Sequence, residues 1–219
     1  YTAAGVSLLL LLLVSTALGV LGCVFTALAV MIFSQHSRMV PQGEGLVLAS
    51  ADGIITRMDA EVALPEALQP ALSEKRLYQR LVIAIGLLDS HINRAPVSGE
   101  VLREAFIPGK PWTLAADMEA PEHERALVAV QGAGEAVIGF TQIAGVIQRR
   151  VVCQLYEGDR VVQGQPYGLI RGGCACEVFV PADYHVLVTE GMRVVAGQTV
   201  LATAQAPETL LPVTSWQKV

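Results

Sequence analysis

The chain has 219 residues, about the length of one to one and a half average domains, which excludes a large multidomain enzyme. Hydrophobic residues make up 53% and charged residues 16%, which excludes a disordered chain, and a formal net charge of −5 disfavours nucleic acid as a main partner. Every Lys, Arg, Asp and Glu lies at or after Arg38. We therefore divide the chain into an N-terminal transmembrane anchor at residues 1–37 and a folded domain at residues 38–219.

Residues 3–33 are almost entirely apolar. As one helix they would extend about 46 Å, against a bilayer hydrocarbon core of about 30 Å. We predict a single transmembrane helix; the alternative is a hairpin broken at residues 19–22, which begin and end with glycine. No second long apolar run follows, which excludes a polytopic transporter. No basic residue precedes the run but Arg38 follows it, so the positive-inside rule predicts an inner (cytoplasmic) membrane protein with its folded domain on the cytoplasmic side.

The folded domain is expected to be mostly β with minor α. Short runs rich in β-branched and aromatic residues alternate with Gly and Pro turns, which is typical of many short strands. We predict strands on both sides of a turn at Asp52–Gly53, and at residues 80–87, 99–107, 126–130, 136–143, 146–153, 167–170, 176–180 and 200–204. Residues 61–75 are expected to form an ordered loop or a poorly formed helix, because two prolines interrupt them.

A nine-residue motif occurs twice in the folded domain. Glu157–Gln165 (EGDRVVQGQ) and Glu190–Gln198 (EGMRVVAGQ) lie 33 residues apart and are identical at all but two positions. Two glycines around a Val-Val pair suit a turn, a short buried strand and another turn. The copies therefore predict two equivalent corners of a barrel-sandwich hybrid of the biotinyl or lipoyl type. No carrier lysine hairpin lies between them, which excludes a swinging-arm carrier.

The four cysteines do not have the spacing of a disulfide framework or of a zinc site. Cys23 lies in the apolar run, and Cys174 and Cys176 are separated by one residue. We expect a reducing compartment and no metal site.

Six motifs occur in order along the folded domain. They are Ala49–Gly53 (ASADG), Leu88–Gly99 (LDSHINRAPVSG), Glu122–Arg125 (EHER), Gln142–Gly145 (QIAG), Arg149–Arg150 and Tyr167–Arg171 (YGLIR). Together they resemble the phosphatidylserine decarboxylase family, and most closely its short, archaetidylserine decarboxylase-like form. The apolar N-terminus is similar to the membrane anchor of that family.

The resemblance implies a pyruvoyl-dependent decarboxylase. In that family a proenzyme cuts itself between Gly and Ser, and the new N-terminal residue becomes a pyruvoyl group that accepts the substrate amine and the electrons left by CO2. Here the corresponding bond joins Gly173 to Cys174. A thiol is the better nucleophile and would pass through a thioester, so the resemblance implies a pyruvoyl group derived from Cys174. The alternative is that Cys174 is an inert residue in a turn and that the chain stays uncut.

The resemblance also implies roles for side chains. Asp52 would orient His91 and support self-cleavage, and His91 would move protons; taken alone, Asp52 is a turn former and His91 a structural histidine. Arg94 stands where longer members of the family carry a second histidine, and is a candidate for binding the substrate carboxylate or phosphate. The remaining candidates for substrate binding are Arg125 and Arg149. Arg149 and Arg150 end a predicted strand, and a strand end in solvent would explain these two arginines equally well.

Two functions follow as hypotheses. The first is a membrane-anchored decarboxylase that converts a serine phospholipid to the ethanolamine phospholipid, with the membrane and the lipid as its partners. The second is an uncut pseudoenzyme that serves as a structural or accessory subunit of a membrane protein complex. The sequence leaves open whether the chain forms a homo-oligomer.

Overall fold

The computed structural model describes residues 2–33, 37–72, 76–86, 88–109, 123–145, 150–171, 174–205 and 216–219. It separates into two compact units, residues 1–35 and residues 36–219.

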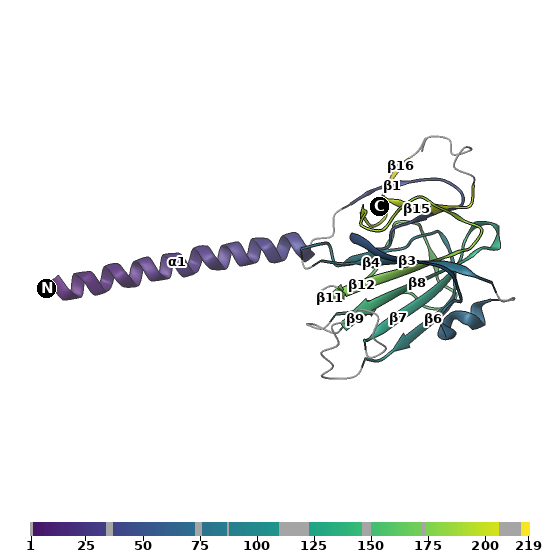
Figure 1. The fold of residues 1–219 in the computed structure, drawn as a ribbon. Coiled ribbons are helices and arrows are strands. Elements are labelled where there is room, and N and C mark those ends of the chain that lie inside the picture. The colour runs from purple at the N-terminus through teal and green to yellow at the C-terminus, as the bar shows by residue number, and fades with distance from the viewer. Residues whose placement is uncertain are drawn as a thin grey trace. The chain divides into compact units, whose positions relative to one another are not determined.

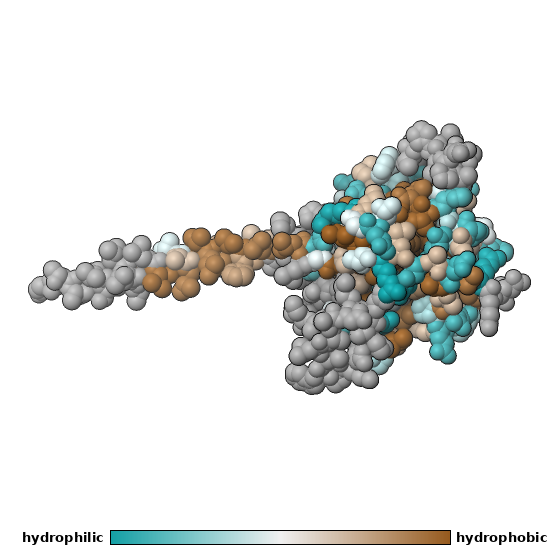
Figure 2. Space-filling model, viewed as in Figure 1, coloured by the Kyte–Doolittle hydropathy of each residue, from teal (hydrophilic) through white to brown (hydrophobic). Residues whose placement is uncertain are grey.

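The first unit is one continuous α-helix, α1 (Thr2–Phe33). It passes through Gly19 and Gly22 without a break, so the chain forms a single helix and not the alternative hairpin. The large apolar side chains that are described on it, from Leu12 to Val30, are exposed (brown in Figure 2). Among the residues described, no helix combines the length and the hydropathy needed to cross a membrane.

The second unit consists mainly of short antiparallel strands, as predicted (Figure 1). Its largest sheet has eight strands. In spatial order they are β10 (Arg160–Val161), β6 (Gly99–Ile107), β7 (Arg125–Gln131), β8 (Val137–Ala144), β12 (Cys174–Pro181), β4 (Tyr78–Ala84), β3 (Gly53–Val62) and β14 (Arg193–Val194).

Within the described residues, three smaller sheets and two short 3-10 helices accompany the large sheet. The sheets are, in spatial order, β5 (Ile92–Arg94), β11 (Pro166–Arg171) and β9 (Arg150–Cys153); β13 (His185–Val186), β15 (Val200–Thr203) and β2 (Leu46–Leu48); and β1 (Met39–Pro41) with β16 (Trp216–Lys218). The 3-10 helices are η1 (Glu66–Ala71) and η2 (Ala133–Glu135). Prolines at positions 65 and 70 keep η1 short, and it buries Leu68 against the sheet beside Tyr78 and Leu127.

The sheet order reads the same from both edges. Ranked by their order along the chain, the four strands of each half run fourth, first, second and third from the edge to the middle: β10-β6-β7-β8 from one edge and β14-β3-β4-β12 from the other. The sheet therefore has two equivalent halves that meet between β8 and β12. Two of the smaller sheets also correspond, β5-β11-β9 in one half and β2-β15-β13 in the other, each with its middle strand last in chain order. The fold is therefore built from two pseudo-symmetric halves.

The repeated motif forms equivalent corners in these halves. Gly158 and Gly191 both adopt positive φ, and so do Gly164 and Gly197. Gly158 donates its N–H to the carbonyl of Val101 and Gly191 donates to that of Ile55, both at 2.8 Å. The acceptors lie 46 residues apart (101 − 55), a second correspondence that the sequence motif alone does not reveal.

The chain passes between the halves twice. It leaves one half at the end of β4 and enters the other at β5, and it returns between the end of β11 at Arg171 and the start of β12 at Cys174. In the other half, β7 and β8 are joined directly by the turn at residues 132–136, closed by a hydrogen bond of 2.8 Å from Gly132 N–H to the Ala136 carbonyl. Consequently β4 and β12 are the arms of an open hairpin whose equivalent in the other half is closed.

One main core contains side chains from both halves, including Ile55, Ile83, Val101 and Val130, each at most 1% exposed. Burying each such side chain stabilises the fold by about 1.5–3 kcal/mol. The strand at residues 99–107 is confirmed, whereas the strand expected at residues 80–87 ends at Ala84, where the crossover begins. Part of the strand expected at residues 146–153 lies outside the described residues, which resume at Arg150.

Candidate functional site

The candidate site lies at the open hairpin. Residue pairing places Ala175, at the start of β12, opposite Ala84 at the end of β4, and Ile54, at the start of β3, is also paired with Ala84. The approach of β3 requires glycine, since a Cβ at Gly53 would lie 2.1 Å from the carbonyl oxygen of Ala84. The Asp52–Gly53 turn, the crossover that leads to His91 and the start of β12 therefore converge at one end of the sheet.

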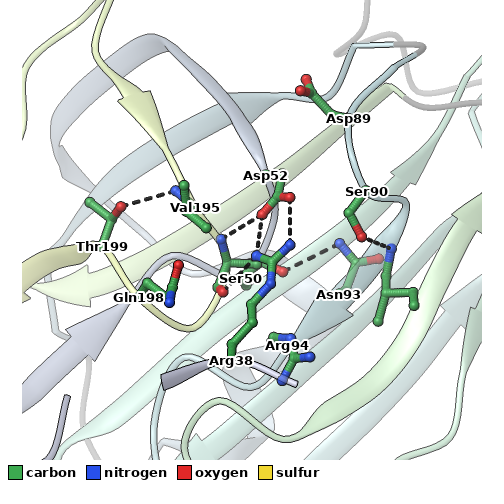
Figure 3. A network of polar contacts seen from close by, with 12 residues as sticks. Arg38, Ser50, Asp52, Asp89, Ser90, Asn93, Arg94, Val195, Gln198 and Thr199 are labelled. Carbon is green, nitrogen blue, oxygen red and sulfur yellow. Dashed lines mark hydrogen bonds and ion pairs between the residues drawn. The ribbon is translucent and has the colours of Figure 1, made fainter. Parts of the chain in front are cut away.

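Asp52 is held by three hydrogen bonds, shown in Figure 3. Arg38 donates from both terminal nitrogens to its carboxylate, at 2.5 Å and 2.7 Å, and the backbone N–H of Ala196 donates at 2.8 Å. Both side chains of the ion pair are only about 15% exposed. Within the described part of the chain, the hydrogen-bond partners of Asp52 are Arg38 and Ala196, and His91 is not among them.

His91 is buried, with 2% of its surface exposed. Its carbonyl accepts a hydrogen bond of 3.0 Å from the N–H of Ile170, which places its backbone beside the strand that leads to residue 172. Burial lowers the pKa of His91, while the Asp89 carboxylate and the backbone of Gly86 act in the opposite direction. The imidazole is therefore neutral at neutral pH and able to accept a proton, and Asp89 is an acidic residue that acts on it.

Arg94 points inward from β5. It is 2% exposed, and its guanidinium donates to the carbonyls of Gly164, at 2.7 Å, and Val219, at 3.4 Å. Burial lowers its pKa first of all; the charge of Arg38 does so too, and Asp52 opposes both. Arg38, Asp52 and Arg94 thus form one charge cluster (Figure 3).

The other predicted site residues fall in different places. Arg125 is half-buried at the start of β7, the same end of the sheet as Cys174. Cys174 is the first residue of β12, where its backbone is paired with Ala144. Gly173, Arg149 and the side chain of Cys174 lie outside the described part of the structure.

A neutral polar network fills the core beneath this end. The hydroxyl of Ser50 lies 2.9 Å from the sulfur of Cys176, and the Gln142 amide donates to the Asn93 amide oxygen at 2.8 Å. Burial raises the pKa of Cys176 to about 12, so this cysteine stays a thiol and is no nucleophile at neutral pH. Cys23, Cys153 and Cys176 are all free.

The sequence predicts Asp52, His91, Arg94 and Cys174 as site residues, but it does not predict two of the groups that act on them. Arg38 is the charged partner of Asp52, whereas the sequence uses it only to predict membrane topology. Asp89 has no predicted role, although its position two residues before His91 is a usable signal.

The start of β12 suits a protein-derived N-terminal group. β12 is paired along its length with β8 on one side and β4 on the other, so its backbone would stay fixed in the sheet if the chain were cut before Cys174. Residues 174–219 also contribute strands paired with β1, β2 and β3, which would retain the smaller fragment. The framework therefore fits a group formed at residue 174.

Comparisons with known proteins agree with this geometry. A family model for phosphatidylserine decarboxylase matches residues 25–202. A phosphatidylserine decarboxylase proenzyme from Saccharopolyspora erythraea is 36% identical over 184 residues, covering 84% of this chain and 76% of the relative. Proenzymes of the same name from Rickettsia rickettsii, 36% identical over 84% of this chain and 78% of theirs, and from Azorhizobium caulinodans, 38% identical over 91% and 83%, are also similar. The chain belongs to the phosphatidylserine decarboxylase family.

Proposed function

We propose that this protein is a membrane-anchored phosphatidylserine decarboxylase that matures by cutting itself between Gly173 and Cys174. The observation that carries the proposal is the open hairpin: residue 174 begins a central strand beside the crossover that holds a buried, neutral His91. The substrate, a serine phospholipid, is taken from the names of the relatives.

The proposed cut needs a nucleophile and a base. The Cys174 thiol attacks the Gly173 carbonyl, so that a C–S bond forms, the amide C–N bond breaks, and His91 passes the thiol proton to the new amine. Loss of the Cα proton of residue 174 then expels a thiocarboxylate on Gly173 and leaves dehydroalanine. Hydrolysis of dehydroalanine releases ammonia and leaves the pyruvoyl carbonyl at residue 174.

A pyruvoyl group at residue 174 would supply a carbonyl that takes up the substrate amine and stabilises the negative charge left by CO2. The rest of the proposed chemistry belongs to the chain itself. Pairing of β12 on both sides holds the backbone of residue 174, and the neutral His91 accepts and returns protons. The charge cluster of Arg38, Asp52 and Arg94 carries one net positive charge beside this end, which suits an anionic phospholipid head group.

Membrane anchoring is proposed for residues 1–37. The support is that this stretch has no charged residue and that α1 is continuous over 32 residues. The equivalent corners described above likewise support the proposed barrel-sandwich architecture. Membrane flotation of the full chain, compared with a chain in which three central leucines of α1 are replaced by glutamate, tests the anchor.

Intact-mass spectrometry with a denaturing gel tests the self-cleavage. We expect fragments of residues 1–173 and 174–219, the smaller one lacking an amine at its N-terminus. A freshly released larger fragment should carry sulfur in place of one carboxyl oxygen, because Cys174 leaves its sulfur on Gly173. Cys174→Ala should abolish the cut, while Cys174→Ser should retain it without the sulfur. A wild-type chain that stays whole after prolonged incubation would overturn the proposal and favour an accessory subunit of a membrane complex.

The pH dependence follows from His91. Its pKa lies below the ordinary value of 6.5, so the proposed base is unprotonated at pH 7 and becomes protonated only as the pH falls below that value. The self-cleavage rate should therefore be level near neutral pH and decline in more acidic solution. The unfolded state binds the proton more readily, so the free energy of unfolding should also fall as the pH drops through 6.5.

A further inference from the structure

The crossover at residues 85–91 is closed on itself by Asp89. The N–H of Gly86 donates to one carboxylate oxygen of Asp89 at 2.8 Å, and the N–H of Asp89 donates to the carbonyl of Gly86 at 3.1 Å. Position 86 leaves room for this carboxylate, since a Cβ there would lie 2.9 Å from it. The path of the chain just before His91 is thus set by Asp89.

The second carboxylate oxygen of Asp89 contacts a residue that would belong to the smaller fragment after the proposed cut. It forms an ion pair with Arg193 in β14, which belongs to the fragment 174–219. The Asp89 side chain is 10% exposed, whereas that of Arg193 is 64% exposed. The equivalent arginine of the first motif copy, Arg160, forms no ion pair among the described residues, so the contact is particular to this half.

We infer that Asp89, held by Gly86 on one side and by Arg193 on the other, is the positioning residue of His91. This inference rests on the proposed function for its role in self-cleavage. The carboxylate of Asp52 is hydrogen-bonded to Arg38 and to the backbone N–H of Ala196. The carboxylate of Asp89, in contrast, is hydrogen-bonded within the segment that leads to His91. The Asp89 carboxylate also acts on the charge of the imidazole, and it is itself paired with Arg193.

The test measures the pKa of His91 in full-length protein in detergent micelles. The Cys174→Ala background keeps the chain whole, so the measurement does not depend on maturation. The chain has four histidines, and loss of one imidazole signal in His91→Gln assigns it by nuclear magnetic resonance. We expect Asp89→Asn to lower the pKa of His91 by about one pH unit, because a nearby carboxylate favours the imidazolium. Asp89→Glu should restore most of it, while Asp52→Asn and Arg160→Gln should leave it unchanged.

Two results would overturn the inference: a His91 pKa that does not move in Asp89→Asn, or one that moves at least as far in Asp52→Asn. If Asp89→Asn does not fold, the other two variants decide. The inference requires the pKa of His91 to stay near its starting value in Asp89→Glu and to be unchanged in Asp52→Asn. In chains that retain Cys174, Asp89→Asn should slow self-cleavage at pH 7 and move the acidic decline to lower pH. A shifted His91 pKa without cleavage in any chain would sink the proposed function and leave this inference standing.

Discussion

The closed β7–β8 hairpin and the open β4–β12 hairpin occupy equivalent places in the two halves of the sheet. In each, a turn before a strand approaches the end of the hairpin: Gly99 lies against the carbonyl of Gln131, and Gly53 lies against that of Ala84. In each, the residue before that glycine accepts a backbone N–H at 2.8 Å, Ser98 from Gln163 and Asp52 from Ala196.

What differs is the connection and the charge. The closed hairpin has a short turn and a neutral serine beside it, whereas the open one has two crossovers, a carboxylate and a paired arginine. The comparison teaches that the same framework fixes the ends of both hairpins. In the open hairpin the direct turn is missing, so a new strand starts there at residue 174. Four comparisons between variants test how far the equivalence reaches.

The largest effect is expected from Asp52→Ser, which copies the residue at Ser98 into the other half. Serine can still accept the Ala196 N–H, so the turn should persist while the carboxylate is lost and Arg38 loses its partner. Because the family resemblance gives this carboxylate a part in self-cleavage, the cleavage rate should fall about 100-fold or more, the usual scale for a residue that supports proton transfer. Pulse-chase gels at pH 7 measure it. An unchanged rate would show that Asp52 does no more than Ser98 does.

The next largest effect is expected from replacing the glycine at the end of each hairpin. Gly53→Ala and Gly99→Ala each place a methyl group about 2 Å from a backbone carbonyl oxygen, at 2.1 Å and 1.9 Å respectively. Each should lower the free energy of unfolding by about 3 kcal/mol, because a strand must shift to relieve the clash. Denaturation in the Cys174→Ala background measures both. A much smaller loss of unfolding free energy in Gly53→Ala than in Gly99→Ala would mean that the strands of the open hairpin shift more easily than those of the closed one.

These same residues show how much of the fold and of the candidate site can be predicted from the sequence. The motif repeat predicted two equivalent corners because turn glycines and Val-Val pairs are local signals. The correspondence between residues 46–57 and 92–103 rests on few identities, such as Gly53 with Gly99, so only strand pairing reveals it. The partners of Asp52 and Asp89 could not be predicted, because Arg38 lies 14 residues before Asp52 and Arg193 lies 104 residues after Asp89, and no local pattern links either pair.

A smaller effect is expected from Arg38→Gln, which removes the charge that marks the open hairpin. Asp52 would keep only the Ala196 N–H in a site about 15% exposed, so stability should fall by about 2 kcal/mol. Arg103→Gln is the matched control. Its ion pair with Glu157 has partners 43% and 50% exposed and should cost no more than about 0.5 kcal/mol. Equal losses in denaturation curves would show that the Arg38 pair is an ordinary surface contact.

The smallest effect is expected from Ser98→Asp, the reverse exchange. Ser98 is exposed and an aspartate there can still accept the Gln163 N–H, so the free energy of unfolding should change by less than about 0.5 kcal/mol. The variant gives the closed hairpin a carboxylate at the position equivalent to Asp52. Since the turn at residues 132–136 stays closed, we expect no new cut there on a denaturing gel and an unchanged rate at residue 174. A new fragment ending near residue 132 would show that the carboxylate, and not the opened hairpin, determines where this fold can break its own chain.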